Sequence, residues 1–334
     1  MTGTDCSPAR ARRPWWALFV LLALLLSPAV GRAQEATPAA GGMVDVLPTP
    51  APLPAAMPRA EGPLVVVATT GILADLVAQV GGERVEVVSL LPANADPHDF
   101  EPAPEDLVRV EGADSVVRHG LGLDEWSEGL IENADAELPV IVATEGIETR
   151  PSDDEEFAEG DPHVWFDPMR TGEMVRNIAA GLSEVDPDGE ATYQARGDAY
   201  AAELRVLDAA IQAAIDTVPR ERRKLVTNHD ALGYYADRYG LEIVGTVIPG
   251  LETTAEPSAR EVATLIEAIE REGVPAIFAE NTTSPALAEE LAAEAGVRVV
   301  DDLYTDSLGE PGSGADTYLG LMRTDTTLIV EALR

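Results

Sequence analysis

Cysteine is almost absent from this sequence, which narrows the chemistry open to it. The 334 residues contain one cysteine, Cys6, and only four histidines. Cys6 precedes the apolar run at residues 15–30, so a chain cleaved after that run has no thiol for a disulfide, a lipid anchor or a metal ligand. Any metal site in the mature chain must therefore consist of imidazole and carboxylate groups.

Positive charge is also scarce. The chain carries 23 Lys and Arg against 59 Asp and Glu. Residues 1–33 hold four Arg and one Asp, so the remainder has 19 basic and 58 acidic side chains, a net charge of −39. Nucleic acids and anionic membrane surfaces attract Lys and Arg, so both are excluded as partners. The charge suits a protein that handles cations, but a salt-adapted surface would carry it too.

Residues 1–33 predict a secretory signal peptide. Three arginines precede the apolar run at 15–30, and Gly31 and Ala33 offer a cleavage site with small side chains. The run is shorter than the roughly 20 residues of a membrane span, so an uncleaved anchor is the weaker alternative. We expect export across the cytoplasmic membrane and a periplasmic or cell-surface location.

Proline and alanine dominate residues 34–63, as in "PTPAPLPAAMP". This composition predicts a semi-extended linker that forms no core of its own. The rest of the chain is long enough for one large domain or two lobes.

Short apolar segments alternate with amphipathic ones from residue 64 onward, in two successive sets. Such alternation predicts parallel sheets with helices on both faces. The expected strands of the first set are 64–69, 85–91, 114–120 and 139–144, and those of the second are 224–229, 242–247, 276–281 and 298–303.

The segment between the two sets predicts one long helix. Residues 189–217 contain no proline, and apolar side chains recur every three or four positions until Pro219. We therefore predict an α/β protein with a first lobe at 64–180, a connecting helix region at 181–219 and a second lobe at 220–334, and a metal site in the cleft between the lobes.

Three histidines and one aspartate follow predicted strands or lie in loops between the lobes. These residues are His98 in "DPHDFEP", His163 in "DPHVWFDP", His229 in "TNHD" and Asp306 in "YTDSLG". Ligands bind at the carboxyl ends of strands in open α/β sheets, so the four loops can converge on one cleft. Three imidazoles and one carboxylate suit a divalent transition metal. Asp301 and Asp302 lie close to Asp306 and are alternatives to it.

Several nearby acids can orient the imidazole rings by accepting their second N–H. The candidates are Asp96, Glu101, Asp161, Asp167 and Asp230. Glu280 in "FAEN" is expected to face the cleft, either in such a hydrogen bond or in a contact between the lobes. We interpret the fourth histidine, His119, as a structural or cleft-lining residue, and the tryptophans Trp126 and Trp165 as packing residues.

Five sequence blocks resemble one family in the family's order. They are "LLPANADPHDFEPAPEDL", "DPHVWFDP", "TNHDALGYYADRYGL", "IFAENTTSPALAEELAAEAGVRVV" and "DSLGEPGSGADTYLGLMRTDTTLIVEAL". The chain is similar to the zinc- and manganese-binding solute-binding proteins of ABC transporters. This resemblance implies two lobes bridged by a rigid backbone helix, with a metal held by His98, His163, His229 and Asp306.

The resemblance also implies a function. We expect a monomeric, extracytoplasmic receptor, not an enzyme, that passes a divalent metal to an ABC permease. Histidine at the third ligand position, His229, is usual in zinc receptors, whereas many manganese or iron receptors have Glu there. We therefore favour Zn²⁺, with Mn²⁺ as the alternative.

Other functions remain open from the sequence. A manganese or iron receptor, a metal-binding surface adhesin and a zinc hydrolase are compatible with the same residues, although a catalytic zinc usually keeps an open position for water. The acidic loop at 152–161 precedes His163 and lacks the histidines found in many zinc receptors. It is either solvated surface or a funnel that attracts cations.

Overall fold

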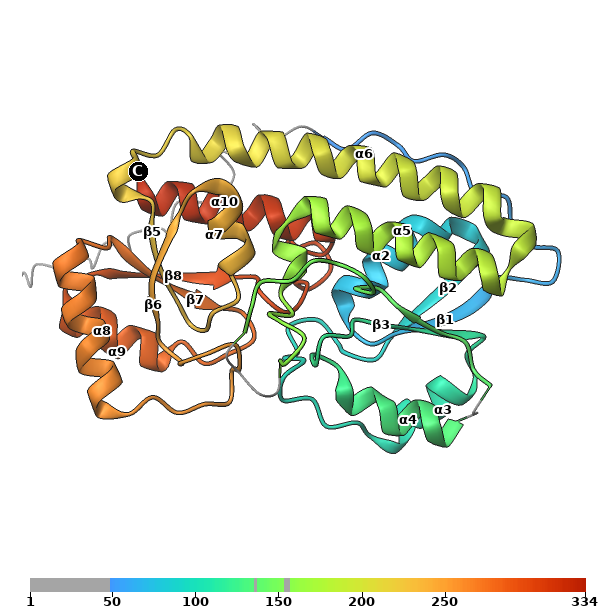
Figure 1. The fold of residues 1–334 in the computed structure, drawn as a ribbon, viewed down its shortest axis with the longest axis horizontal. Coiled ribbons are helices and arrows are strands. Elements are labelled where there is room, and N and C mark those ends of the chain that lie inside the picture. The colour runs from blue at the N-terminus through green and yellow to red at the C-terminus, as the bar shows by residue number, and fades with distance from the viewer. Residues whose placement is uncertain (1–48, 135–136, 153–156) are drawn as a thin grey trace, which may run out of the picture. The chain divides into compact units, whose positions relative to one another are not determined.

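Two parallel sheets of four strands each organise the chain. The computed structural model describes residues 49–134, 137–152 and 157–334. Each sheet lies among helices, and one long helix, α6 (Glu190–Ile215), runs along both (Figure 1). This arrangement confirms the predicted α/β fold with two lobes and one connecting helix.

The first sheet has the strand order β2-β1-β3-β4. Its strands are β1 (Leu64–Ala68), β2 (Val85–Ser89), β3 (Ser115–Arg118) and β4 (Val140–Val142). Alternate residues of β1 enter different cores. Val66 and Ala68 pack with α2 (Gly71–Gly81), whereas Val67 packs on the opposite face with residues from α3 (Pro104–Glu111) and α4 (Glu128–Ala134). Burial on both faces explains why these strands are continuous apolar runs.

The second sheet repeats this pattern with the order β6-β5-β7-β8. Its strands are β5 (Lys224–Thr227), β6 (Glu242–Thr246), β7 (Ala276–Glu280) and β8 (Arg298–Leu303). Leu225 belongs to the large core, together with side chains of α7 (Gly233–Tyr239) and α10 (Tyr318–Leu333). Its neighbour Val226 packs instead with α8 (Ala259–Glu272) and α9 (Ala286–Ala295).

The long helix α6 contacts helices of both lobes. It packs on α5 (Pro168–Val185) and α2 in the first lobe and on α10 and α7 in the second. The stripe predicted from the sequence lies on its buried face, which consists of Tyr193, Gly197, Tyr200, Ala201, Leu204, Leu207, Ile211 and Ile215. At 1.5 Å per residue the helix is about 39 Å long. Because it is continuous and buried along one side, it resists bending between the lobes.

Five short 3-10 helices complete the described secondary structure. They are η1 (Gly82–Arg84), η2 (Glu125–Ser127), η3 (Val164–Phe166), η4 (Pro187–Gly189) and η5 (Arg220–Arg222). Of these, η3 follows His163 directly and so fixes the start of the segment that leads into α5.

The described part of the Pro/Ala-rich segment, residues 49–63, contains no helix or strand but contacts the first lobe. Arg84 donates a hydrogen bond to the Met57 carbonyl at 3.0 Å, and Arg196 of α6 donates one to Pro54. Leu53 packs against the large core. These contacts hold the segment along the first lobe and α6 (Figure 1).

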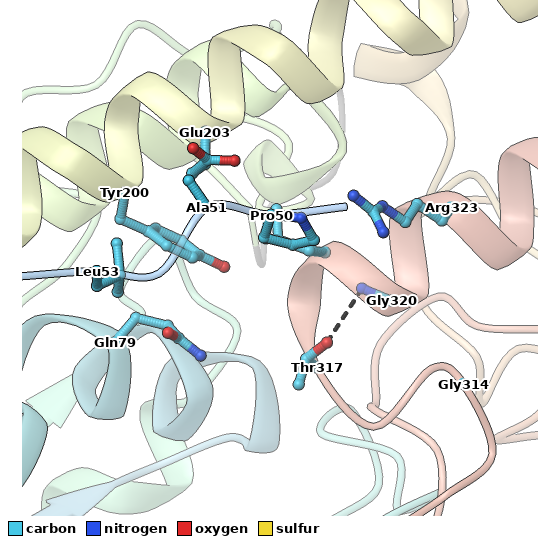
Figure 2. Close-up of a pocket in the computed structure, with 11 residues that line it drawn as sticks. Pro50, Ala51, Leu53, Gln79, Tyr200, Glu203, Gly314, Thr317, Gly320 and Arg323 are labelled. Atoms are coloured by element: carbon cyan, nitrogen blue, oxygen red, sulfur yellow. Dashed lines mark hydrogen bonds between the residues drawn. The ribbon is translucent and has the colours of Figure 1, made fainter. Parts of the chain in front are cut away.

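The same segment forms one wall of a pocket of about 340 Å³ between α2, α6 and α10 (Figure 2). The buried Tyr200 hydroxyl lies at this pocket and has no hydrogen-bond partner among the described residues. The predicted signal peptide at 1–33 and the linker residues before 49 lie outside the described part of the chain. Within that part, no helix is both long and apolar enough to cross a membrane.

The buried face of α6 predicts a clear contrast between two neighbouring positions. Leu204 is fully buried, whereas Val206 is 46% exposed. Leu204→Ala removes core contacts and leaves a cavity, so we expect a loss of about 2–5 kcal/mol of unfolding free energy. Val206→Ala should change it by less than about 0.5 kcal/mol. Denaturant unfolding of the metal-free protein measures both, and equal effects would contradict the assigned helix face.

Candidate metal centre

Four side chains from separate loops meet between the two sheets. One potential ligand atom from each of His98, His163, His229 and Asp306 lies within 4.8 Å of the others. All four side chains are at most 1% exposed. The structure thus brings together all the residues that the sequence predicted for a metal site, and Asp306 rather than Asp301 or Asp302 belongs to the group.

The parallel strand topology explains this convergence. His98 lies between β2 and α3, and His163 immediately precedes η3. His229 follows β5, and Asp306 follows β8. His98 and His163 come from first-lobe loops, whereas His229 and Asp306 come from the carboxyl ends of second-lobe strands, the usual ligand-binding edge of open α/β sheets.

The separations among the His163, His229 and Asp306 side chains are close to those of a tetrahedral metal site. The Nε2 atoms of His163 and His229 are 3.2 Å apart. Asp306 Oδ1 lies 3.4 Å from His163 Nε2, and its Oδ2 lies 3.4 Å from His229 Nε2. Bonds of about 2.0–2.1 Å in a tetrahedral site place ligand atoms roughly 3.3 Å apart. The fourth group is slightly farther away, with His98 Nε2 at 3.9 Å from Asp306 Oδ1.

Two of these atoms are buried polar groups without a hydrogen bond. His98 Nε2 and Asp306 Oδ1 have no partner among the described residues. Leaving such groups unsatisfied is costly, and native structures rarely do so without a reason. A cation at the centre would satisfy both.

Carboxylates hold two of the imidazole rings from behind. Asp161 Oδ1 lies 2.8 Å from His163 Nδ1, and Glu280 Oε2 lies 2.7 Å from His229 Nδ1. Each hydrogen bond places the proton on Nδ1 and leaves Nε2 free to coordinate. The role expected for Asp161 is therefore observed, and for Glu280 the hydrogen-bonding alternative is the one found.

The other acids that were predicted to accept an imidazole N–H have different contacts. Asp96 accepts a hydrogen bond from the backbone N–H of His98 at 2.9 Å, so it shapes the loop and not the ring. Asp167 caps the first turn of α5 and pairs with Arg170.

The remaining two candidates do not hold an imidazole ring. The Nδ1–H of His229 is accepted by Glu280 and not by Asp230, and Glu101 is exposed. Proximity in sequence thus identified the partner of His163 but not that of His229, because Glu280 reaches His229 from the neighbouring strand β7.

The buried carboxylates control the protonation of the rings. Burial alone lowers the pKa of His163, but its hydrogen bond to Asp161 and the charges of Asp161 and Asp306 outweigh burial and raise this pKa to about 10. Burial likewise lowers the pKa of His229, and the charges of Glu280 and Asp306 raise it overall. Burial raises the pKa of Asp306, yet the neighbouring imidazoles hold it well below its usual value. In the absence of a metal, protons on the His163 and His229 rings therefore balance the negative charge of the buried carboxylates.

Two tryptophans fix the loops that carry the cluster. Trp126 Nε1 donates to the Pro97 carbonyl at 3.2 Å, next to His98. Trp165 Nε1 donates to the Thr305 carbonyl at 2.9 Å, next to Asp306. Their structural role was expected, but their position directly behind two cluster residues was not apparent from the sequence.

His119 lies outside the four-residue group. Its Nε2 is 2.8 Å from the Pro162 carbonyl, and its ring packs on Trp165 with centroids 5.2 Å apart. Burial lowers its pKa to about 4, so the ring is neutral. His119 thus supports the segment before His163, in agreement with its interpretation as a structural residue.

Two further contacts to His98 were not predicted. Glu252 Oε1 lies 3.8 Å from His98 Nδ1. Phe157, from the acidic loop, is buried and packs edge-on against the His98 ring with centroids 6.0 Å apart. The acidic residues at 153–156 lie outside the described residues, but Phe157 shows that the end of this loop is part of the cluster's surroundings. In the sequence, the position of Phe157 as the one aromatic residue of an acidic loop was the only indication of this contact.

Comparison with known proteins identifies a family over most of the chain. The family model described as "Zinc-uptake complex component A periplasmic" matches residues 66–332. The manganese-binding lipoprotein MntA of Halalkalibacterium halodurans is 32% identical over 270 residues, covering 81% of this chain and 88% of that protein. The metal ABC transporter substrate-binding lipoprotein SsaB of Streptococcus sanguinis is 27% identical over 277 residues, with coverages of 81% and 89%.

Solved structures agree with this match. The periplasmic zinc-binding protein TroA of Treponema pallidum superposes with a TM-score of 0.76 at 30% identity, covering 81% of this chain and 99% of that one. A manganese-bound periplasmic metal-binding protein of Candidatus Liberibacter asiaticus gives 0.73 at 26% identity, with coverages of 81% and 100%. Sequence, fold and the buried cluster lead to one assignment: the chain belongs to the zinc-uptake component A family, the substrate-binding proteins of metal ABC transporters.

Proposed function

We propose that this protein binds one divalent transition metal ion at His98, His163, His229 and Asp306, with Zn²⁺ preferred over Mn²⁺. It captures the ion outside the cytoplasm and delivers it to an ABC permease. The observation that carries the proposal is the geometry of the cluster, in which three Nε2 atoms and one carboxylate face a common centre. All four groups come from one chain, so a monomer suffices.

The ligand types support zinc. Three neutral imidazoles and one carboxylate form a tetrahedral set typical of Zn²⁺, and at such ligands the affinity order of first-row metals also places Zn²⁺ above Mn²⁺. The family description names zinc uptake and the periplasm, and the TroA structure is of a zinc-binding protein.

Manganese is the second candidate, and one feature of the site favours it. Both oxygens of Asp306 face imidazoles, at 3.4 Å each. A bidentate Asp306 would supply a fifth ligand atom, and oxygen ligands at higher coordination numbers suit Mn²⁺. MntA of H. halodurans is named as manganese-binding.

Metal competition distinguishes the two candidates. Metal-free protein offered equal Zn²⁺ and Mn²⁺ should retain one Zn²⁺ per chain in native mass spectrometry. His229→Glu replaces an imidazole by a carboxylate. In competitive calorimetry, the ratio of its Zn²⁺ affinity to its Mn²⁺ affinity should therefore be smaller than that of the wild type. Exposed Glu101→Gln is the matched control and should behave like the wild type. Tighter binding of Mn²⁺ than of Zn²⁺ by the wild type would overturn the zinc assignment.

The raised pKa of His163 predicts metal binding that releases protons. A proton on this ring stabilises the metal-free fold below the unfolded pKa of about 6.5, and that contribution is lost as the pH rises through about 10. The metal needs the neutral ring, so its affinity must rise with pH. We expect the dissociation constant for Zn²⁺ to fall about tenfold per pH unit for each proton released, between about pH 6 and 8.

Two measurements check this dependence. Calorimetry in buffers of different ionisation enthalpy should show at least one proton released per Zn²⁺ at neutral pH. The difference in Tm between metal-loaded and metal-free protein should widen over the same pH range. A dissociation constant that does not change with pH would show that no protonated imidazole is displaced.

A further inference from the structure

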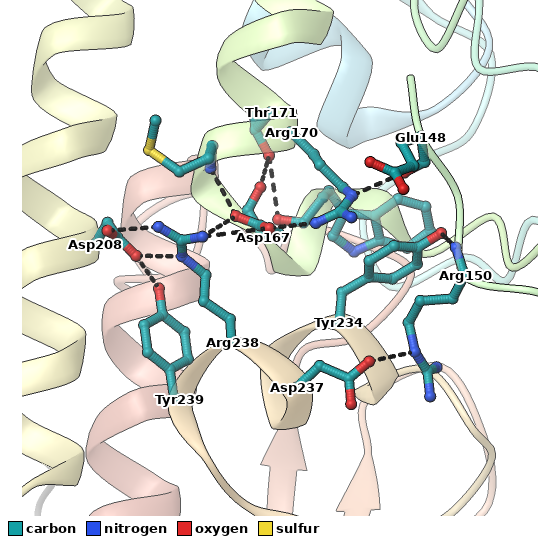
Figure 3. A network of polar contacts seen from close by, with 12 residues as sticks. Glu148, Arg150, Asp167, Arg170, Thr171, Asp208, Tyr234, Asp237, Arg238 and Tyr239 are labelled. Carbon is teal, nitrogen blue, oxygen red and sulfur yellow. Dashed lines mark hydrogen bonds and ion pairs between the residues drawn. The ribbon is translucent and has the colours of Figure 1, made fainter. Parts of the chain in front are cut away.

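Helix α7 of the second lobe contacts the first lobe through two arginines (Figure 3). Arg238, on α7, pairs with Asp208 of α6 at 2.5 Å and with Asp167 of the first lobe at 3.3 Å. Arg150, on the first-lobe segment before His163, reaches in the opposite direction and pairs with Asp237 of α7 at 2.8 Å. Both arginines hold the lobes together, but their other contacts differ.

Of the two arginines, Arg150 is the one that connects this contact to the metal cluster. Its Nη1 lies 2.9 Å from Asp161 Oδ2, while Asp161 Oδ1 lies 2.8 Å from Nδ1 of His163. One buried carboxylate thus holds the guanidinium group with one oxygen and the imidazole with the other. The Asp161 side chain is 1% exposed and that of Arg150 is 31% exposed, so the carboxylate is shielded from water and the guanidinium group only in part. Within the described part of the chain, the polar contacts of Arg238 are with Asp208 and Asp167 and not with Asp161 or His163, so Arg238 is a suitable comparison.

Helix α7 fixes the position of Arg150 by close packing. A Cβ atom at Gly233 would lie 1.6 Å from Nη1 of Arg150, so the guanidinium group rests directly on the glycine backbone. The buried Tyr234 hydroxyl accepts the Arg150 backbone N–H at 2.8 Å and donates to the Asp161 carbonyl at 2.7 Å. The Asp237 carboxylate is 69% exposed, so its ion pair adds little. Gly233 and Tyr234 are therefore the main second-lobe contacts of Arg150.

We propose that Arg150 is a positioning residue that couples metal retention to the contact between α7 and the first lobe. With α7 in place, Arg150 holds Asp161, and Asp161 holds the His163 ring toward the metal. When α7 separates from the first lobe, Arg150 loses Gly233 and Tyr234, and Asp161 loses its fixed partner. The His163 ring is then free to turn, and the metal dissociates faster. A transporter that separates the lobes would release the ion by this route.

This inference rests on the proposed function and is tested from both sides of the contact. Arg150→Ala removes the guanidinium group. Gly233→Ala leaves Arg150 and Asp161 intact but displaces the guanidinium group, and alanine favours a helix more than glycine does. Arg238→Ala removes the other arginine and is the control for a weakened lobe contact. Zn²⁺ dissociation into excess chelator, followed by stopped flow, gives the rate for each protein.

We expect Arg150→Ala and Gly233→Ala each to speed zinc dissociation about tenfold, the lower end of the effect of removing groups behind metal ligands. The double variant should be no faster than either single variant, because both act on one contact. Arg238→Ala should lower the Tm of metal-free protein and leave the dissociation rate within about twofold. Co²⁺-loaded Arg150→Ala and Gly233→Ala should show an altered visible absorption spectrum, whereas Arg238→Ala should keep the wild-type spectrum.

Three results would overturn the proposal. Equal dissociation rates for wild type and Gly233→Ala would show that the guanidinium position does not matter. Equal acceleration in Arg238→Ala would reduce Arg150 to a general lobe contact. Additive effects in the double variant would place the two residues in separate contacts. Failure of the wild type itself to bind Zn²⁺ or Co²⁺ would contradict the proposed function instead, so the two failures are distinct.

Discussion

Balancing negative charge inside the protein is the constraint on which this structure depends. Three carboxylates, from Asp161, Glu280 and Asp306, lie almost fully buried beside two imidazole rings. Buried charges are costly unless they are paired and hydrogen-bonded. In the metal-free protein the pairing comes from protons, because the carboxylates raise the pKa values of His163 and His229. A bound dication would take the place of these protons, and the same carboxylates would then balance its charge.

The two lobes must be held together for these charged groups to meet. Neither lobe holds a complete site, since His98 and His163 belong to the first and His229 and Asp306 to the second. The α6 helix contacts both lobes along its buried face and limits how far they separate. Relative movement of the two lobes must then consist of small shifts at contacts such as that of Arg150 with Gly233. Packed interfaces change between discrete arrangements and do not deform smoothly.

The loops around the cluster are held by side chains as well as by the backbone. Trp126 and Trp165 each bond to the carbonyl next to a cluster residue. Asn94, in the His98 loop, accepts a hydrogen bond from Asn281 of the second lobe at 2.9 Å, and its backbone N–H donates to Leu308. The His98 loop is thus bonded to the opposite lobe. Loops fixed in this way keep the cluster side chains in place before any metal arrives, which would lower the cost of binding one.

The sequence by itself determined the strands, the long helix and the three histidines of the cluster, and it narrowed the fourth residue to one of three aspartates. Apolar runs of strand length, a proline-free stretch with one apolar stripe, and a histidine after a strand are local patterns that a single chain displays. Only the tertiary structure decided which groups stand behind those residues. Glu280 reaches His229 across 51 residues, and Arg150 meets Gly233 across 83. The first pairing depends on the order of strands within the second sheet, and the second depends on how the two lobes pack. No local pattern encodes either.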